Sequence, residues 1–304
     1  MSAAGRPERE YRSAQHEGDP VRAKGRPERE YRSAQHEGDL IRATLATPLH
    51  EYLLRLADSP LVLAQRLCEW VGKGPALEED IALANVGLDL LGQARMWFAY
   101  AGEVEAGHAA TGRAATAARD EDALAFRRDA HEFRNLLLVE QPNGDYATTI
   151  VRQFLFDHAQ WLLLSRLAQS ADTRIGAIAA KALKEVTYHV ERSDDWMLRL
   201  GDGTDESHAR MQRAIDGLWM YAGEMFVVDD IDLVLIDAGI GVDLRTLEVP
   251  WLAAVDAVLA AATLARPPHA HVQRGGRQGR HSEHLGHLLC EMQFLQRTYP
   301  DARW

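Results

Sequence analysis

Apolar residues recur at three- and four-residue intervals along most of the chain after residue 46, which is the periodicity of α-helices. This spacing predicts four long helices, over residues 47–72, 78–102, 145–170 and 173–200. Shorter helical segments follow near residues 206–225, 229–237, 247–264 and 282–297. Runs of alternating β-branched residues are almost absent, and only residues 226–235 have a pattern compatible with a strand. The chain is therefore predicted to be all-α.

Residues that favour helix ends support these boundaries. The acidic run Glu78–Asp80 suits the N-terminus of the second long helix. Asp145 is a predicted N-cap for the third, and residues 201–204 read as a C-cap followed by the next N-cap. Between the second and third long helices we expect a linker at residues 106–118 and a further helix over residues 120–139.

Two pairs of long helices joined by a longer crossover are typical of a ferritin-like four-helix bundle. The segments after residue 205 are predicted to be additional C-terminal helices. Residues 45–304 are therefore expected to form one ferritin-like helical domain.

A tandem duplication precedes this domain. Residues 5–19 read GRPEREYRSAQHEGD, and residues 25–39 repeat the same fifteen letters at a 20-residue period. Two copies are too few for a solenoid, and each copy has one Tyr and few aliphatic residues to offset the entropy of ordering. We expect residues 1–44 to be a disordered tail, with a partner-binding segment as the alternative.

Composition narrows the class of protein. The 304 residues hold 34 Lys and Arg against 45 Asp and Glu, a formal net charge of −11, which disfavours nucleic-acid binding. Two cysteines, Cys68 and Cys290, cannot build a disulfide framework. The absence of a long apolar run or an apolar signal core predicts a cytoplasmic protein without a membrane span.

A ferritin-like bundle raises the question of a di-iron site. Such a site takes one Glu from each of two helices and a Glu-x-x-His pair from each of the other two. The long helices contain no Glu-x-x-His: Glu185 is followed by Tyr188, and His189 is preceded by Val186. The sequence therefore predicts a bundle that holds no metal and carries no catalytic residue of its own.

Polar residues nevertheless lie on the apolar faces of the long helices. We interpret them as a buried polar network in place of a di-iron site, because buried polar groups need partners. Its predicted members are Gln65, Asp89, Asp157, Lys181, Glu185 and His189. The alternative is a free-standing, diverged di-metal oxidase that uses Asp89, Asp157, Glu185 and His189, together with His158.

Two further patterns are candidate ligand-binding sites. His281, His284 and His287 recur at three-residue spacing and could form a helical zinc- or copper-binding module, although a helical turn packed on its neighbours is the interpretation we favour. Residues 274–280 alternate Arg with Gly, which suits an anion held by backbone N–H groups. For this loop we favour a solvated linker.

Several long segments together resemble a known family. They are LVLAQRLCEWVGKGPALEEDIALANVGLDLLGQAR (61–95), EFRNLLLVEQPNGDYATTIVRQFLFD (132–157), AAKALKEVTYH (179–189), RLGDGTDES (199–207) and GGRQGRHSEHLGHLLCEMQFLQRTYP (275–300). These strings are similar to the PaaC-type subunits of phenylacetyl-CoA epoxidases. The similarity covers about residues 47–304, and residues 1–44 do not contribute to it.

The resemblance implies a non-catalytic structural subunit with a ferritin-like fold. Its implied partner is the catalytic di-iron oxygenase subunit, which epoxidises the ring of phenylacetyl-CoA or a related acyl-CoA. A coupling protein and a reductase with NADPH, flavin and an Fe–S cluster complete such a system. No cofactor is implied for this chain.

The resemblance also implies contacts with the acyl-CoA. They fall on seven residues, Glu132, Phe133, Arg134, Asn135, Leu233, Val234 and Leu235. Phe133 and Asn135 keep the residue types of the family's site, whereas the other five are changed or conservative variants, for which backbone contacts matter more.

Overall fold

The computed structural model describes residues 27–110, 118–268, 271–300 and 302, and the chain divides into a unit 1–42 and a compact unit 43–304. Within the described ranges every regular element is helical, and no helix is long and apolar enough to cross a membrane. The α-helices are α1 Pro27–Cys68, α2 Leu77–Ala110, α3 Glu121–Phe126, α4 Leu137–Glu140, α5 Tyr146–Leu167, α6 Thr173–Gly201, α7 Asp205–Ala222, α8 Asp230–Asp237, α9 Arg245–Ala261, α10 Glu283–Met292 and α11 Phe294–Thr298. Three short 3-10 helices are η1 Ala130–Glu132, η2 Gly223–Phe226 and η3 Gly276–Gln278.

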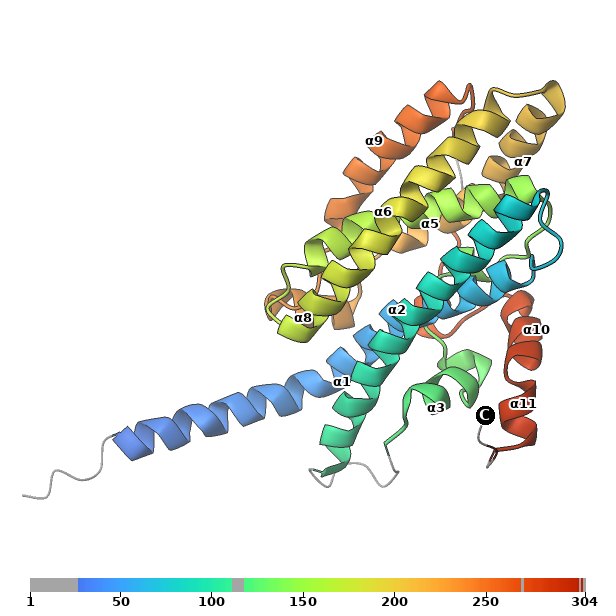
Figure 1. Ribbon diagram of the computed structural model, residues 1–304. Coiled ribbons are helices and arrows are strands. Elements are labelled where there is room, and N and C mark those ends of the chain that lie inside the picture. Colours follow the sequence, from blue (N-terminus) through green and yellow to red (C-terminus); the bar gives the residue numbers. More distant parts are fainter. Residues whose placement is uncertain (1–26, 111–117, 269–270, 301, 303–304) are drawn as a thin grey trace, which may run out of the picture. The chain divides into compact units, whose positions relative to one another are not determined.

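The core of the compact unit is built on the four long helices α1, α2, α5 and α6 (Figure 1). Helix α5 packs along α6, and α7 and α9 pack against both. Helix α2 contacts α6, and Gly87 of α2 lies against Ala64 and Leu67 of α1. The fully buried side chains that fill the space between them include Trp97, Phe154 and Phe156. The fold is thus an all-α, ferritin-like bundle with added C-terminal helices, as the sequence predicted.

The predicted helix ends are confirmed where caps were expected. The Asp145 carboxylate accepts a hydrogen bond from the Thr148 N–H at 2.9 Å, and the Thr204 hydroxyl accepts one from the Ser207 N–H at 3.2 Å. One boundary differs, because α2 continues to Ala110 and takes in the first part of the predicted linker 106–118. Residues 111–117 of that linker lie outside the described residues.

The single helix predicted over residues 120–139 is wrong. Helix α3 ends at Phe126, η1 follows, and the chain is extended at Phe133 and Leu136 before α4 begins. The reason is tertiary, because the backbone N–H groups of this stretch find partners on α1. The Arg134 N–H donates to the Asp58 carboxylate at 2.7 Å, and the Leu136 N–H donates to the Ser59 hydroxyl at 3.1 Å. These bonds replace the intrahelical ones that periodicity alone would predict.

The second copy of the duplicated segment also differs from expectation. Helix α1 begins at Pro27, so residues 27–44 are helical in the structure, where a disordered tail was expected. The segment is rich in Glu, Arg and Ala, which have high helix propensity. The first copy, within residues 1–26, lies outside the described residues.

Candidate functional site

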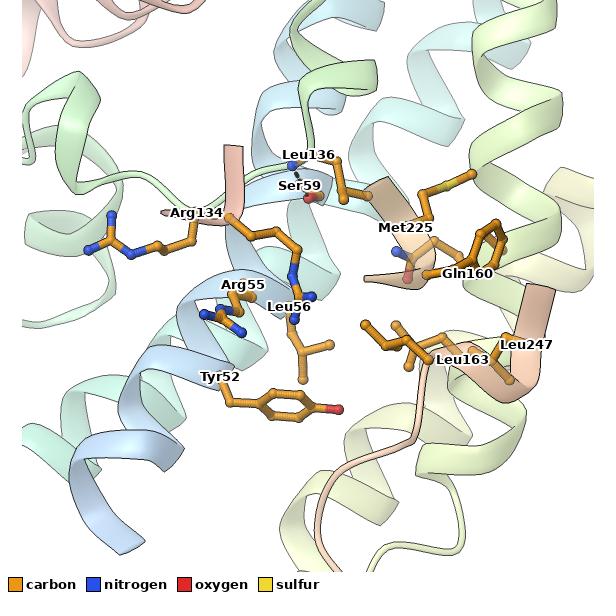
Figure 2. A pocket seen from close by; sticks show the side chains of 14 residues that line it. Tyr52, Arg55, Leu56, Ser59, Arg134, Leu136, Gln160, Leu163, Met225 and Leu247 are labelled. Atoms are coloured by element: carbon orange, nitrogen blue, oxygen red, sulfur yellow. Dashed lines mark hydrogen bonds between the residues drawn. The ribbon is translucent and has the colours of Figure 1, made fainter. Parts of the chain in front are cut away.

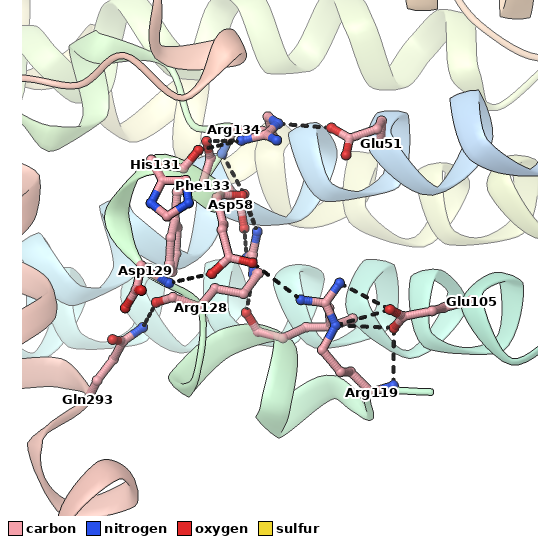
Figure 3. A network of polar contacts seen from close by, with 12 residues as sticks. Glu51, Asp58, Glu105, Arg119, Arg128, Asp129, His131, Phe133, Arg134 and Gln293 are labelled. Atoms are coloured by element: carbon pink, nitrogen blue, oxygen red, sulfur yellow. Dashed lines mark hydrogen bonds and ion pairs between the residues drawn. The ribbon is translucent and has the colours of Figure 1, made fainter. Parts of the chain in front are cut away.

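An extended segment, residues 133–136, lies at the centre of the candidate site, with one buried ion pair beneath it. The Arg128 guanidinium donates to both carboxylate oxygens of Asp58, and both side chains are essentially inaccessible to solvent. The same guanidinium lies 4.3 Å from the centroid of the Phe133 ring. Figure 3 shows Asp58 between Arg128 and the backbone of Arg134. The ion pair therefore fixes the path of the extended segment against α1.

Two buried carboxylates join this segment to the loop before α10. Glu224 accepts three backbone N–H bonds of 2.8 Å each, from Leu137, Gly275 and Gly276. Glu140 accepts from the Asn135 side chain at 3.1 Å and from the Ser282 N–H at 2.6 Å. Since such charge-assisted bonds are the stronger ones, the two loops are held as one unit.

The Arg- and Gly-rich loop 274–280 is therefore not the solvated linker that we favoured from its sequence. Its backbone N–H groups do bind an anion, but the anion is the internal carboxylate of Glu224. Arg277 is buried and donates to Asp232 at 2.6 Å. A Cβ at position 276 would overlap the carbonyl oxygen of Asn135, so only glycine allows this approach.

The seven residues with implied acyl-CoA contacts divide into two groups. Phe133, Asn135 and Leu235 have no exposed surface, so their side chains support the site from the interior of the protein. Arg134 and Glu132 are half-buried, and Leu233 and Val234 on α8 are exposed. Arg55 binds Asp229 and Arg277 binds Asp232, at the start of α8, and both arginines line a pocket with Arg134.

That pocket is small and its charges are matched. Its volume is about 60 Å³, and Tyr52, Arg55, Arg134 and Leu136 are among its lining residues (Figure 2). Arg55 pairs with Asp229 at 2.7 Å and Arg134 with Glu51 at 2.8 Å. A space of this size accommodates a few water molecules and is well below the ~300 Å³ typical of a ligand pocket. The pocket is therefore too small to hold an acyl-CoA.

Arg134 also lines a second, more open pocket of about 260 Å³. Most of its lining residues are of polar type, among them His50, Glu51, Glu105 and Arg119. Figure 3 shows Arg134 reaching toward Glu51, and Arg119 held by Glu105. Arg134 therefore lines both pockets, and 21% of its side-chain surface is exposed.

The predicted buried polar network of the bundle is present only as separate pairs. His189 Nε2 lies 3.1 Å from Asp89, and the Gln93 side chain donates to Glu185 at 3.0 Å. Lys181 is exposed, and Gln65 is half-buried. The inclusion of Lys181 in a buried network was therefore wrong, because its position on α6 faces solvent.

The histidines and carboxylates of the bundle lie in separate contacts. His158 is engaged by Asp194 at 2.8 Å, and Asp157 lies fully buried beside Ser193. Across residues 27–110, 118–268 and 271–300, no group of three or more His, Cys, Asp or Glu side chains could hold a metal ion. The His158–Asp194 pair joins α5 to α6, and the His189–Asp89 pair joins α6 to α2.

Two core groups have shifted acidities. Burial raises the pKa of Asp157 to about 8, which a hydrogen bond from Ser193 only partly opposes. Burial also lowers the pKa of His189, against the hydrogen bond and charge of Asp89, which raise it. At neutral pH the Asp157 carboxyl is thus held in its neutral form inside the bundle.

A change at Asp157 is expected to alter how stability depends on pH. The unfolded state ionises Asp157 near pH 4, whereas the folded state keeps its proton up to about pH 8, so this group makes folding less favourable as pH rises between those values. Relative to the parent chain, Asp157→Asn should gain up to about 5 kcal/mol of unfolding free energy between pH 4 and 8, at ~1.36 kcal/mol for each unit of the pKa shift. Urea unfolding at several pH values measures this, with the exposed Asp237→Asn as control. An unchanged difference across that range would contradict the prediction.

The three histidines near the C-terminal helices do not form a site. His281 precedes α10 and lies 3.0 Å from Glu140 through Nδ1 and 3.0 Å from the Phe133 carbonyl through Nε2. His284 is half-buried and His287 is exposed on α10. His281 thus belongs to the contacts that fix the extended segment, which agrees with the packed turn that we favoured.

Comparison with known proteins identifies the class. The family model described as phenylacetic acid catabolic protein (PaaA_PaaC) matches residues 34–304, so the chain belongs to this family. The match begins inside the second copy of the duplicated segment, so the expectation that residues 1–44 take no part was wrong for residues 34–44. A curated relative is one of the subunits of the 1,2-phenylacetyl-CoA epoxidase of Escherichia coli strain K12. It is 50% identical over 256 residues, which are 84% of this chain and 99% of that protein.

Proposed function

We propose that this chain is a non-catalytic structural subunit of a multicomponent phenylacetyl-CoA 1,2-epoxidase, in which it stabilises the catalytic di-iron oxygenase subunit. Two observations support the proposal. The relative that matches over nearly its whole length is a subunit of such an epoxidase. In the bundle, Asp89 is paired with His189 and Glu185 with Gln93. Carboxylates and imidazoles on such helices are the ligands that a di-iron centre would need.

The pairing of these core groups is the observation that carries the proposal. A carboxylate bound to an imidazole or an amide across two helices satisfies both polar groups at that contact and fixes the register of the two helices. The chain then offers a rigid support, with the coupling protein, the reductase and the oxygenase subunit supplying the redox chemistry.

We further propose that the chain contributes to acyl-CoA binding through its surface residues. The exposed side of Arg134 and the side chains of Leu233 and Val234 are the accessible members of the implied contact set. Phe133, Asn135 and Leu235 are buried and act by positioning the backbone. A guanidinium suits a phosphate of the CoA moiety, and the two aliphatic side chains suit an apolar part of the ligand.

Replacing Arg134 tests this contribution. In the assembled epoxidase, Arg134→Ala should raise the KM for phenylacetyl-CoA by roughly 3–10-fold with little change in kcat, because one charge-assisted contact is lost in both the ground and transition states. Arg245→Ala, at an exposed arginine paired with Asp243, is the matched control. An unchanged KM would remove Arg134 from the binding site.

The structural role is tested by co-expression. The oxygenase subunit encoded with this chain should be recovered as a stable, iron-containing complex when both are expressed, and should lose yield and thermal stability when expressed alone. Recovery of equally stable and active oxygenase subunit without this chain would contradict the proposal.

A further inference from the structure

Two backbone carbonyl groups lie where the short helices α3 and η1 cannot provide a hydrogen-bond donor. Ala125 is in the last turn of α3, which ends at Phe126, and the last carbonyls of a helix have no intrahelical donor. The next regular element, η1, begins at Ala130, so the carbonyl of the buried Arg128 lies between the two helices. Because buried carbonyls need partners, another part of the chain has to supply the donors.

Side chains at the junction of α10 and α11 supply these donors. Gln293, which is only 2% exposed, donates from Nε2 to the Ala125 carbonyl at 3.1 Å and to the Arg128 carbonyl at 3.0 Å. The Arg297 guanidinium donates to the same Arg128 carbonyl at 2.8 Å and to the Asp129 carboxylate at 2.8 Å. Figure 3 shows Gln293 next to the backbone of Arg128. The junction therefore holds the backbone between α3 and η1.

The Gln293 amide is held in one orientation. Its Oε1 accepts a hydrogen bond from Arg297 Nε at 2.9 Å, and its Nε2 makes both bonds to carbonyl oxygens. Turning the amide over would place its oxygen against two carbonyl oxygens and its NH₂ group against a guanidinium. In a buried network of this kind, a shift of one member leaves a polar group without a partner. Gln293 is therefore suited to fixing the position of the Arg128 backbone.

Arg128 connects this junction to the extended segment. Its carbonyl is bound by Gln293 and Arg297, while its guanidinium pairs with Asp58. The Asp58 carboxylate in turn accepts the Arg134 N–H at 2.7 Å. A shift of the Arg128 backbone would move its guanidinium and draw the Asp58 carboxylate away from Arg134. The hydrogen bonds thus form a continuous chain from α11 to Arg134, through which a change at one end can reach the other.

We propose that Gln293 is a positioning residue for the acyl-CoA contact of Arg134, and that Arg297 assists it by fixing the amide. The inference rests on the proposed function, in which Arg134 binds the ligand. Gln293 is buried, so it acts through the Arg128–Asp58 pair and does not touch the ligand itself. Loss of its two donors lets Arg134 leave the binding position. The fraction of the chain that can bind falls, and the apparent dissociation constant rises by the same factor.

Gln293→Met tests the positioning role in the assembled epoxidase. Methionine is similar in length but has no donor, so the KM for phenylacetyl-CoA should rise about three- to tenfold with kcat unchanged. Because Gln293 acts through Arg134, the double variant that combines Gln293→Met with Arg134→Ala should have the KM of Arg134→Ala alone. Gln169→Met, at an exposed position after α5, is the matched control and should behave as the parent does.

Hydrogen exchange in the separate, full-length chain gives a readout that does not depend on the ligand. In Gln293→Met the amides of Arg134 and Leu136 should exchange about tenfold faster than in the parent. Val255→Ala, a change in the buried core of α9, controls for a general loss of stability and should leave these two amides and the KM unchanged. Arg297→Met, at a side chain that is 43% exposed, serves if Gln293→Met does not fold, and should raise the KM by a smaller factor.

The outcomes separate this inference from the proposed function. Unchanged exchange at Arg134, or a KM in the double variant equal to the product of the two single effects, would overturn the positioning role and leave the acyl-CoA contact of Arg134 standing. A lower kcat at unchanged KM in Gln293→Met would also overturn it, because Gln293 would then support only the fold. An unchanged KM in Arg134→Ala itself would overturn the acyl-CoA contact and, with it, the inference.

Discussion

Asp58→Asn is expected to lower the free energy of unfolding by about 3–5 kcal/mol, the usual cost of breaking a buried ion pair on one side. Asp58 and Arg128 are both almost fully buried, and the carboxylate also accepts the Arg134 N–H at 2.7 Å. An amide at position 58 keeps the shape of the side chain but leaves the Arg128 charge without a counter-ion. Urea unfolding followed by circular dichroism measures the change.

The control for this variant is Asp237→Asn, at an exposed position on α8. It should change the unfolding free energy by no more than about 0.5 kcal/mol. The account also expects the extended segment 133–136 to loosen first in Asp58→Asn, which hydrogen exchange at its amides would detect. A loss in unfolding free energy no larger than that of the control would show that the ion pair does not hold this segment.

Glu224→Gln is expected to destabilise the chain by roughly 2–4 kcal/mol. The carboxylate accepts three backbone N–H bonds, from Leu137, Gly275 and Gly276. The neutral side chain has one oxygen and one NH₂ group, so at least one N–H would face another donor. Because the bonds join two distant loops, the effect should include faster proteolysis at residues 274–280.

The matched control is Glu248→Gln, an exposed position on α9. Comparison of melting temperatures and of limited proteolysis for the two variants separates a general loss of charge from the loss of this particular site. Equal behaviour of the two variants would contradict the role given to Glu224.

The helical architecture could be predicted because it depends on local periodicity and caps. The starts of α5 and α7 follow from Asp145 and Thr204, whose side chains bond to N–H groups three residues ahead. The breakdown of the helix after Phe126 could not be predicted in the same way. It depends on Asp58 and Ser59, which are more than 70 residues away along the chain.

The contacts around the candidate site also depend on residues that are distant along the chain. The resemblance implies contacts at residues 132–135 and 233–235; of these, Arg134 lines a pocket with Arg55 and Arg277, and residues 233–235 follow Asp232, which Arg277 binds. Glu140 and Glu224 were not predicted from the sequence. The signal available was a single carboxylate inside an apolar stretch, as in LLLVEQP, but one sequence does not show which distant donors satisfy it.

Helical spacing also predicted one connected network of polar groups in the bundle, whereas the structure has separate pairs. It placed Lys181, Glu185 and His189 on one side of α6, yet Lys181 is exposed while His189 is buried. Residues four apart differ by about 40° around a helix, so a stripe of three drifts from the core to the surface. Only contacts across helices determine which members are paired.

The most direct test of the structural role is the distribution of iron in the purified complex. Iron should be measured for this chain alone, for the co-expressed complex, and for the two subunits after separation, together with dioxygen consumption by each fraction. We predict a pair of iron ions with the oxygenase subunit and no stoichiometric iron or dioxygen consumption with this chain. A pair of iron ions bound by this chain alone, with turnover that is lost in Asp89→Ala and His189→Ala, would contradict it.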